Sequence, residues 1–236
     1  MKFALMLGGA AVLLAAGTTG WFSYRVSRMP ESRYSAIHSI ADIRQIETTF
    51  TPDFIRSDLT FEQMTEAMDH YAHDRQILLV QPTDDVCMSH GQLIQKVQVK
   101  QVYEGDQALS GTELPISYYF FHIQTYAEME MARSHGKTCD SPNVYHPSFM
   151  NYMDPASECL VFVNRYQFLD HTVYTAPHPN VPWNFSLTDT REPAIVPTDA
   201  VCSYSQVSDG EIFVEDQAGA ENWKKLKQQI LAQYCI

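Results

Sequence analysis

Three histidines in the second half of the chain are the residues best placed to do chemistry together. His146, His171 and His178 lie in a region expected to be rich in loops, and Asp170 directly precedes one of them. Imidazole and carboxylate groups bind zinc-like ions and act as general acids and bases. Binding residues concentrate on loops, so these four are a candidate metal or acid–base site. The alternative is that they remain apart in the folded protein.

A second pair of histidines lies at the end of a predicted helix. His70 and His73 are three residues apart and are flanked by Asp69 and Asp74. This spacing puts both rings on one helix face, where they could hold a metal ion. We favour the simpler interpretation, a polar helix end at which histidine interacts with the last carbonyl groups.

Aromatic residues gather among prolines between residues 145 and 183. Such a segment could line an exposed groove that recognises a peptide or a glycan. The alternative is that the rings hold a long irregular segment against a sheet. The candidate ligand-binding residues are Tyr152, Tyr166, Phe168, Tyr174 and Trp183.

Motifs of known catalytic sites are absent from the sequence. There is no G-x-S-x-G or H-E-x-x-H pattern, and no glycine-rich loop of the Walker or dinucleotide type. We therefore expect no cofactor and favour a protein without catalytic activity, while the question of an enzyme stays open.

Five cysteines are spread along the chain without a C-x-x-C pair, which disfavours a zinc ribbon or a thioredoxin-type site. Cys139 and Cys159 flank a segment rich in proline and asparagine. In an oxidising compartment they are the disulfide that we expect, and closing this loop would contribute about 3 kcal/mol. The alternative is reduced cysteines that pack as small apolar side chains.

The remaining pattern predicts an α+β domain. Thr60 and Gln63 form a capping box for a helix whose apolar face carries Phe61, Met64, Met68 and Tyr71. Strands are predicted at 76–81, where Pro82 ends the run, at 94–103 with a bulge between Ile94 and Val97, at 113–124, at 159–164 and at 212–214.

An amphipathic helix is expected at the C-terminus, over residues 222–234. Its apolar face carries Trp223, Leu226, Ile230 and Tyr234, and its lysines at 224, 225 and 227 should face solvent. Residues 57–236 are therefore expected to form a single globular domain.

The strands at 76–164 resemble the OB-type antiparallel β-barrel of netrin-like domains, including the tissue inhibitors of metalloproteinases. The resemblance rests on the apolar strand 77–80, on the alternating valines at 97, 99 and 102 before Gly105-Asp106, on the strand 116–121 and on 158–163. The pattern is also similar to uncharacterised exported or lipid-anchored proteins of Gram-positive bacteria. It implies a fold and no activity, because an inhibitor needs an N-terminal cysteine that is missing here.

The first 28 residues differ sharply from the rest. No charged residue lies between Phe3 and Tyr24, and a helix of this length would span about 33 Å, enough for a bilayer core. Trp21, Phe22, Arg25 and Arg28 then suit a membrane interface. The alternative is a cleaved signal peptide with Ala15 and Gly17 before the cut. Residues 29–56 follow as a juxtamembrane linker and irregular segment.

The charge is strongly acidic after this segment. The whole chain has 16 basic and 28 acidic residues, and residues 29–236 retain 13 of the basic ones and all of the acidic ones. A nucleic acid would need a basic face, so we exclude it as a partner. We expect contact with the membrane through the N-terminal segment alone.

These observations predict a domain that is held at the cell membrane by a single pass, with the domain extracytoplasmic, or that is secreted after cleavage. Its expected role is a non-enzymatic binding or protein-interaction module, with an unknown protein, peptide or glycan as partner. The alternative function is a metal- or carboxylate-assisted hydrolase that uses the loop histidines.

Overall fold

The computed structural model describes ten stretches of one compact unit that spans 37–236. The described residues are 37–45, 49–52, 54–89, 92–120, 122–123, 144–146, 148–168, 171–188, 191–196 and 202–234. The predicted signal or anchor segment, 1–28, lies outside them. Within the described stretches, no helix combines the length and the apolar character that crossing a bilayer requires.

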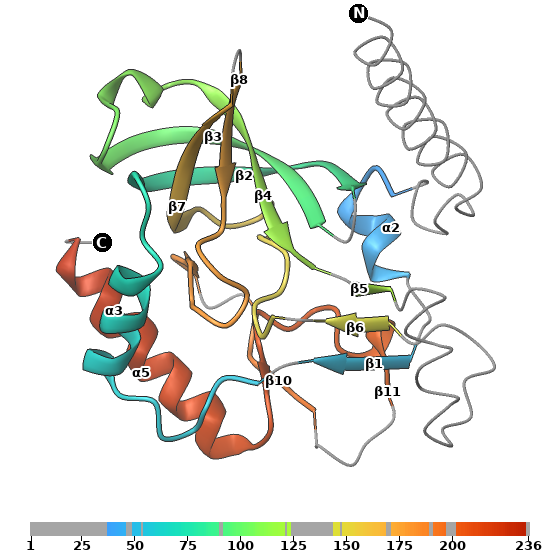
Figure 1. The fold of residues 1–236 in the computed structure, drawn as a ribbon. Coiled ribbons are helices and arrows are strands. Elements are labelled where there is room, and N and C mark those ends of the chain that lie inside the picture. The colour runs from blue at the N-terminus through green and yellow to red at the C-terminus, as the bar shows by residue number, and fades with distance from the viewer. Residues whose placement is uncertain are drawn as a thin grey trace, which may run out of the picture. The chain divides into compact units, whose positions relative to one another are not determined.

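Most elements in the described part of the chain are strands, and the α-helices lie near its two ends (Figure 1). The α-helices are α2 (Ile40–Arg44), α3 (Phe61–His70) and α5 (Gln217–Gln233), and the 3₁₀ turns are η1 (Gln107–Leu109) and η2 (Tyr204–Gln206). The strands are β1 (Thr49–Pro52), β2 (Arg75–Ser89), β3 (Gln92–Glu104), β4 (Glu113–Tyr119), β5 (His122–Ile123), β6 (Val144–His146), β7 (Cys159–Phe168), β8 (His171–Thr175), β9 (Asn184–Ser186), β10 (Ala194–Ile195), β11 (Cys202–Ser203) and β12 (Phe213–Val214). The predicted α+β class is confirmed.

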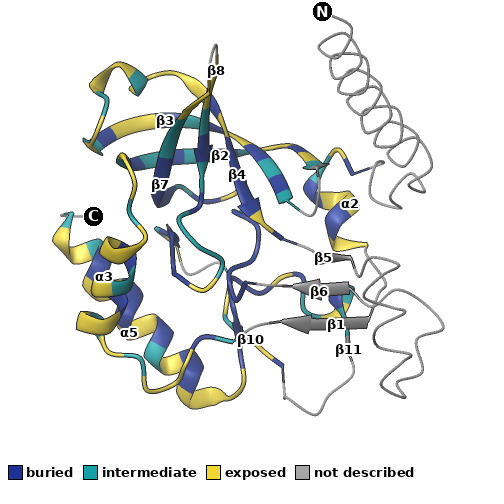
Figure 2. Cartoon of the chain, in the orientation of Figure 1, coloured by how far each residue is buried: buried dark blue, intermediate teal, exposed yellow. Residues whose placement is uncertain are grey.

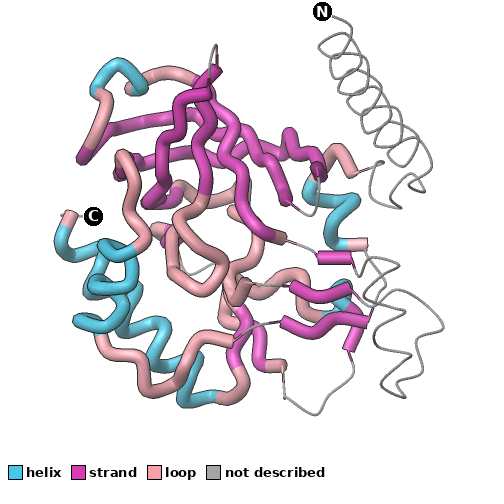
Figure 3. Tube along the Cα trace, viewed as in Figure 1, coloured by secondary structure: helices cyan, strands magenta, loops and turns pink. Residues whose placement is uncertain are grey.

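Five strands close a barrel in the order β2-β3-β4-β8-β7, with β7 pairing back onto β2 (Figures 1 and 3). The pair β4–β8 is parallel, with Ile116 opposite Tyr174, and the other four pairs of the ring are antiparallel. The predicted barrel is thus present, but it is mixed and not purely antiparallel. The parallel pair arises because β8, which the sequence pattern did not reveal, returns beside β4.

The inward face of β3 differs from the prediction. Leu93, Gln95, Val97 and Val99 are all buried, so β3 itself keeps its alternation until Val99. The irregularity expected between Ile94 and Val97 is present in the pairing with β2, but its extra residues lie in β2, between Pro82 and Val86. The buried amide of Gln95 donates to the carbonyls of Thr83 and Met153, each at 2.9 Å, and accepts from the Tyr118 hydroxyl at 2.7 Å. These bonds remove the cost of burying a polar side chain, which the sequence alone could not anticipate.

β2 is longer than predicted because Pro82 does not end it. The strand continues to Ser89, and its register against β3 shifts between Pro82 and Val86. Proline cannot donate a hydrogen bond to a neighbouring strand, so it is tolerated where the pairing is irregular.

The helix at Thr60 is confirmed with its cap. The Thr60 hydroxyl accepts from the Gln63 backbone N–H at 3.2 Å, and the Gln63 side chain accepts from the Thr60 N–H at 3.1 Å. Met64 and Met68 are buried, as their spacing predicts, whereas Tyr71 lies after the helix and is partly exposed.

The C-terminal helix α5 begins five residues earlier than predicted, with Asp216 as its N-cap. Its buried face turns toward the strands, and its outer face is exposed (Figure 2). Trp223, Leu226 and Ile230 are buried as expected, but Lys227 is only 3% exposed, so the prediction that it faces solvent is wrong.

Lys227 is buried because Glu211 meets it inside the protein. The Lys227 ammonium group lies 3.0 and 3.1 Å from the two Glu211 carboxylate oxygens, and it also donates to the Thr188 carbonyl. The Trp223 indole N–H donates to the same carboxylate at 3.1 Å. A buried ion pair is stable only when its remaining hydrogen-bonding groups are also satisfied, and this one fixes α5 to the segment before β12.

The short helix α2 lies within the segment predicted as a linker. Ser39 and Asp42 form a capping box, and Ile40 and Ile43 are buried. The Ile40 backbone N–H donates to Asp84 at 2.9 Å, which joins this helix to β2.

Cys159 has a free thiol, in place of the disulfide with Cys139 that the sequence favoured. Its side chain is buried at the start of β7, and burial raises its pKa well above the ordinary value. Cys139 lies outside the described residues. The environment of Cys159 is that of a small apolar core residue.

Candidate functional site

Four rings stack along the outside of the β7–β8 hairpin, and we call them the ring column: His73, Tyr166, Phe168 and His171. The centroids of His73 and Tyr166 are 4.8 Å apart with planes at 19°. Tyr166 and Phe168 are 6.4 Å apart at 31°, and Phe168 and His171 are 5.9 Å apart at 25°. These spacings are typical of favourable aromatic contacts.

The strand register brings three of these rings together. Tyr166 and Phe168 are two residues apart and so share one face of β7, and Phe168 pairs directly with His171 of β8. The pairing of β7 with β2 ends at Asn164, so the hairpin reaches past the neighbouring strands (Figure 1). No described element covers it there, and Phe168 remains 52% exposed.

Asn164 places the fourth ring. Its buried side chain accepts from the His73 backbone N–H at 2.9 Å and donates to the Tyr71 carbonyl at 2.9 Å. One amide of β7 therefore fixes both ends of the turn that follows α3, and this turn presents His73 to Tyr166.

The next residue, Asp74, has a left-handed backbone with φ of 44°. Its carbonyl accepts from the Gln76 side chain at 2.9 Å and from the Arg165 backbone N–H at 3.3 Å. A non-glycine residue in this region costs free energy and persists only where its surroundings hold it. The position of His73 is therefore fixed before any ligand binds.

A second group of rings lies on the other side of the same turn. Tyr71 stacks on His178 with centroids 4.2 Å apart at 17°, and His70 meets Tyr71 edge-on at 4.8 Å. The His178 Nδ1 atom accepts from the Asn180 backbone N–H at 3.2 Å, and desolvation lowers the His178 pKa below its ordinary value. Both effects favour neutral His178.

Two arginines and four carboxylates form ion pairs at the barrel rim beside the ring column. Arg165 donates to Asp74 at 2.8 Å and to Asp106 at 3.1 Å. Arg75 donates to Glu104 at 3.1 Å and also pairs with Asp69. The hydrogen bond to Asp74 raises the pKa of Arg165, and the one to Glu104 raises the pKa of Arg75. We call the four carboxylates, Asp69, Asp74, Glu104 and Asp106, the acidic strip.

The predicted aromatic groove is present only in part. Tyr166 is partly exposed and Phe168 is exposed, and their rings are in contact, as an exposed aromatic groove would need. Tyr152, Tyr174 and Trp183 are buried, so for these three the alternative of rings that hold the fold together is correct. Tyr152, for example, stacks under the Arg191 guanidinium at 4.1 Å, and its hydroxyl accepts from Arg44 at 2.7 Å.

The predicted metal site finds no support in the described part of the chain. His171 stacks on Phe168 and His178 stacks on Tyr71, so they belong to different ring groups. The side chain of His146 in β6 and all of Asp170 lie outside the description. Among the described side chains, no three His, Cys, Asp or Glu groups are arranged to hold a metal ion.

Sequence reasoning missed the roles of Tyr71 and His73. His73 was considered only as a metal ligand or helix cap, and Tyr71 only as a core residue. A possible signal is Asn164, a polar residue at the end of the apolar run 159–163, because such a residue must find hydrogen-bond partners when the strand is buried.

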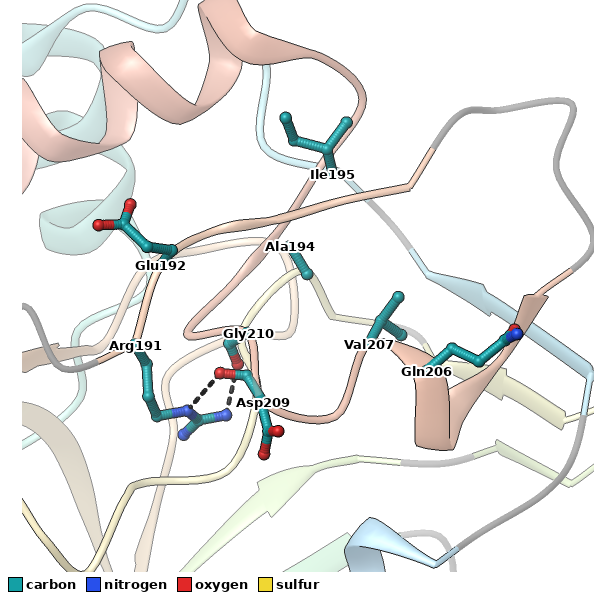
Figure 4. A pocket seen from close by; sticks show the side chains of 8 residues that line it. All are labelled: Arg191, Glu192, Ala194, Ile195, Gln206, Val207, Asp209 and Gly210. Atoms are coloured by element: carbon teal, nitrogen blue, oxygen red, sulfur yellow. Dashed lines mark hydrogen bonds between the residues drawn. The ribbon is translucent and has the colours of Figure 1, made fainter.

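A groove of about 390 Å³ next to β10 is a second candidate site (Figure 4). Arg191 lies in its wall, but its N–H groups are bonded to the carbonyls of Asp209 at 3.0 Å, Tyr152 at 2.9 Å and Ser208 at 3.1 Å, and also to Gly210. Four of the five guanidinium N–H groups are thus used within the fold. Arg191 shapes the groove and has little capacity left for a ligand.

The edge of β10 beside this groove is also a poor docking site. Ala194 and Val196 donate inward to Ile212 and Val214, which leaves Pro193 and Ile195 on the outer side. Proline offers no N–H there, so an added strand could gain little.

Comparisons with known proteins found no match among family models, curated proteins or solved structures. The assignment of a function therefore depends on the geometry alone.

Proposed function

We propose that the domain is a non-enzymatic binding module and that the ring column recognises a peptide segment of a partner protein. The observation that carries this proposal is the 52% exposure of Phe168 within an ordered stack of rings. Aromatic rings of this kind supply much of the binding free energy in protein interfaces.

The fixed geometry of the column supports binding. Asn164 holds the turn that carries His73, and β-pairing holds Phe168 against His171. A surface that is ordered before binding loses less conformational entropy when the partner arrives. The column therefore needs no rearrangement to present its rings.

The stacking favours a peptide over a glycan. Neighbouring rings are nearly parallel, with planes within 31° of each other, but the centroid of Phe168 lies 6.4 Å from that of Tyr166 and 5.9 Å from that of His171. The rings are therefore offset, and they present strips of ring face in place of one broad flat face. A partner meets ring edges and strips of ring face, which suit the carbonyl groups and planar side chains of a peptide better than the broad face of a sugar ring.

We also propose that the barrel is of the OB type. Its order β2-β3-β4-β8-β7 with a parallel β4–β8 pair supports this assignment. The resemblance to netrin-like domains remains a prediction, and it gives no ligand.

The proposed location is outside the cytoplasm, either at the cell membrane or secreted. The apolar segment 3–24 and the acidic remainder of the chain support export. The intact mass of the native protein tests this: loss of about 17 to 28 residues means cleavage, and a full-length mass in the membrane fraction means an anchor. A full-length protein in the soluble cytoplasm would refute export.

Selection from a random peptide library displayed on phage tests the binding function. The full-length chain is the bait, and each enriched peptide is measured again on Phe168→Ala and on Ile195→Ala. Ile195 is a matched control, since it is 45% exposed on β10. We expect peptides that lose at least about tenfold in affinity on Phe168→Ala and none on Ile195→Ala, as for an interface hot spot. If no enriched peptide depends on the column, the proposal is wrong.

A further inference from the structure

We propose that the partner segment of the ring column carries arginine, so that the domain recognises a cationic peptide. This inference rests on the proposed function and adds the chemistry of the ligand. It is carried by the exposed rings together with the uneven exposure of the ion pairs beside them.

The carboxylates of the acidic strip face solvent more than the guanidinium groups do. The Asp74 side chain is 47% exposed and that of its partner Arg165 is 32% exposed. The same order holds in each of the other three pairs, Arg165–Asp106, Arg75–Asp69 and Arg75–Glu104. Four carboxylates and two arginines give this part of the rim a net negative charge. The more exposed groups are the carboxylates, so the negative charge faces solvent.

The acidic strip reaches both faces of β7 beside the ring column. Arg75 lies opposite Asn164, which shares its face of β7 with Tyr166. Asp69 and Glu104, the partners of Arg75, are therefore on the side of the column. Arg165 points to the opposite face with Asp74 and Asp106. A partner that covers the column therefore comes close to the exposed carboxylates of Asp69 and Glu104. Each carboxylate can accept several hydrogen bonds, so its pairing with an arginine does not exhaust it.

The charge of the whole chain favours the same kind of partner. The net charge is −12, and all 28 acidic residues lie after the N-terminal 28 residues. A field of one sign steers oppositely charged partners toward the surface and opposes acidic ones. A neutral or acidic peptide would gain nothing from it.

Arginine suits this surface better than lysine. Its planar guanidinium group stacks on aromatic rings and forms paired hydrogen bonds with a carboxylate, whereas the lysine ammonium group is a compact, strongly hydrated charge. Stacked rings beside exposed carboxylates offer both interactions at one place.

Synthetic peptides test the inference. The column-dependent peptides from the phage selection are made with each arginine kept, replaced by lysine or replaced by citrulline, which is neutral and similar in shape. Affinities for the full-length chain are measured by titration calorimetry at two salt concentrations. Asp69→Asn is compared with Asp85→Asn, which removes an exposed carboxylate paired with Lys96 elsewhere on β2.

We expect arginine in the column-dependent peptides and a loss of at least about tenfold with citrulline, a smaller loss with lysine, and weaker binding at high salt. Asp69→Asn should weaken binding several-fold more than Asp85→Asn. Column-dependent peptides that lack arginine, or that bind equally with citrulline, would overturn the inference and leave the binding function standing. Arginine peptides that bind Phe168→Ala unchanged would also overturn it. If no peptide depends on the column, both proposals fail.

Discussion

The two halves of β7 carry the same alternation of side chains in opposite surroundings. Phe162 and Phe168 lie on one face of the strand, six residues apart. Phe162 is buried and meets Phe185 and Tyr234 with ring centroids 5.8 Å away. Among the described rings, Phe168 meets only Tyr166 and His171, and it is half exposed. The difference is what covers each half: Tyr234 at the end of α5 and Phe185 of the neighbouring strand β9 pack on the first half, and no described element lies over the second. Identical residues therefore belong to the core in one half and stay exposed in the other.

The largest expected effect comes from the covered half. Phe162→Ala should lower the free energy of unfolding by about 3–5 kcal/mol, because it leaves a cavity under α5. Urea unfolding of the full-length chain measures this. A loss below about 1 kcal/mol would mean that α5 does not pack on β7 as described.

Breaking the buried ion pair between Lys227 of α5 and Glu211 should destabilise the protein by a similar amount. Glu211→Ala leaves the buried Lys227 ammonium group without its counterion and should cost about 3–5 kcal/mol. The double variant Glu211→Leu/Lys227→Met should be less harmful than either single change, because it leaves no unpaired charge. The control Lys224→Ala removes an exposed partner of Glu192 and should cost at most about 1 kcal/mol. Equal effects of Lys224→Ala and Glu211→Ala would contradict the account.

Substitution of Asn164, which lies between the two halves of β7, should lower the free energy of unfolding by an intermediate amount. Asn164→Ala removes the bonds to the His73 N–H and the Tyr71 carbonyl and should cost about 1–3 kcal/mol. It should also loosen the stack of His73 on Tyr166, seen as a loss of ring-current shifts in the NMR spectrum. Gln167→Ala, an exposed neighbour, is the control and should leave these shifts in place.

The sequence predicts the features that depend on nearby residues and misses those that depend on residues far away in the chain. Local signals located α3, β4 and the buried face of α5, because capping and periodicity depend on neighbours in the chain. The burial of Gln95 and Lys227 was not predictable, since each depends on partners far away in sequence. The sequence indicated an aromatic segment. It could not indicate that Tyr152 is buried and Phe168 exposed, because that depends on which elements of the fold pack against each ring.

The smallest expected effect is on pH dependence. His178 has a lowered pKa in the folded protein, so the unfolded chain binds its proton more readily. The stability that neutral His178 contributes is complete above pH 6.5, the ordinary value, and is lost as pH falls through the folded pKa. His178→Gln should therefore flatten the decline in stability between pH 7 and pH 5 in part. An unchanged slope would contradict the desolvated position of His178.

The most direct test of the recognition role is Phe168→Ala, measured for binding and stability on the same sample. The account predicts at least about a tenfold loss of affinity for the selected peptide. It also predicts a free energy of unfolding within about 0.5 kcal/mol of the wild type, as for a surface residue. Unchanged affinity, or a loss of stability as large as that of Phe162→Ala, would contradict it.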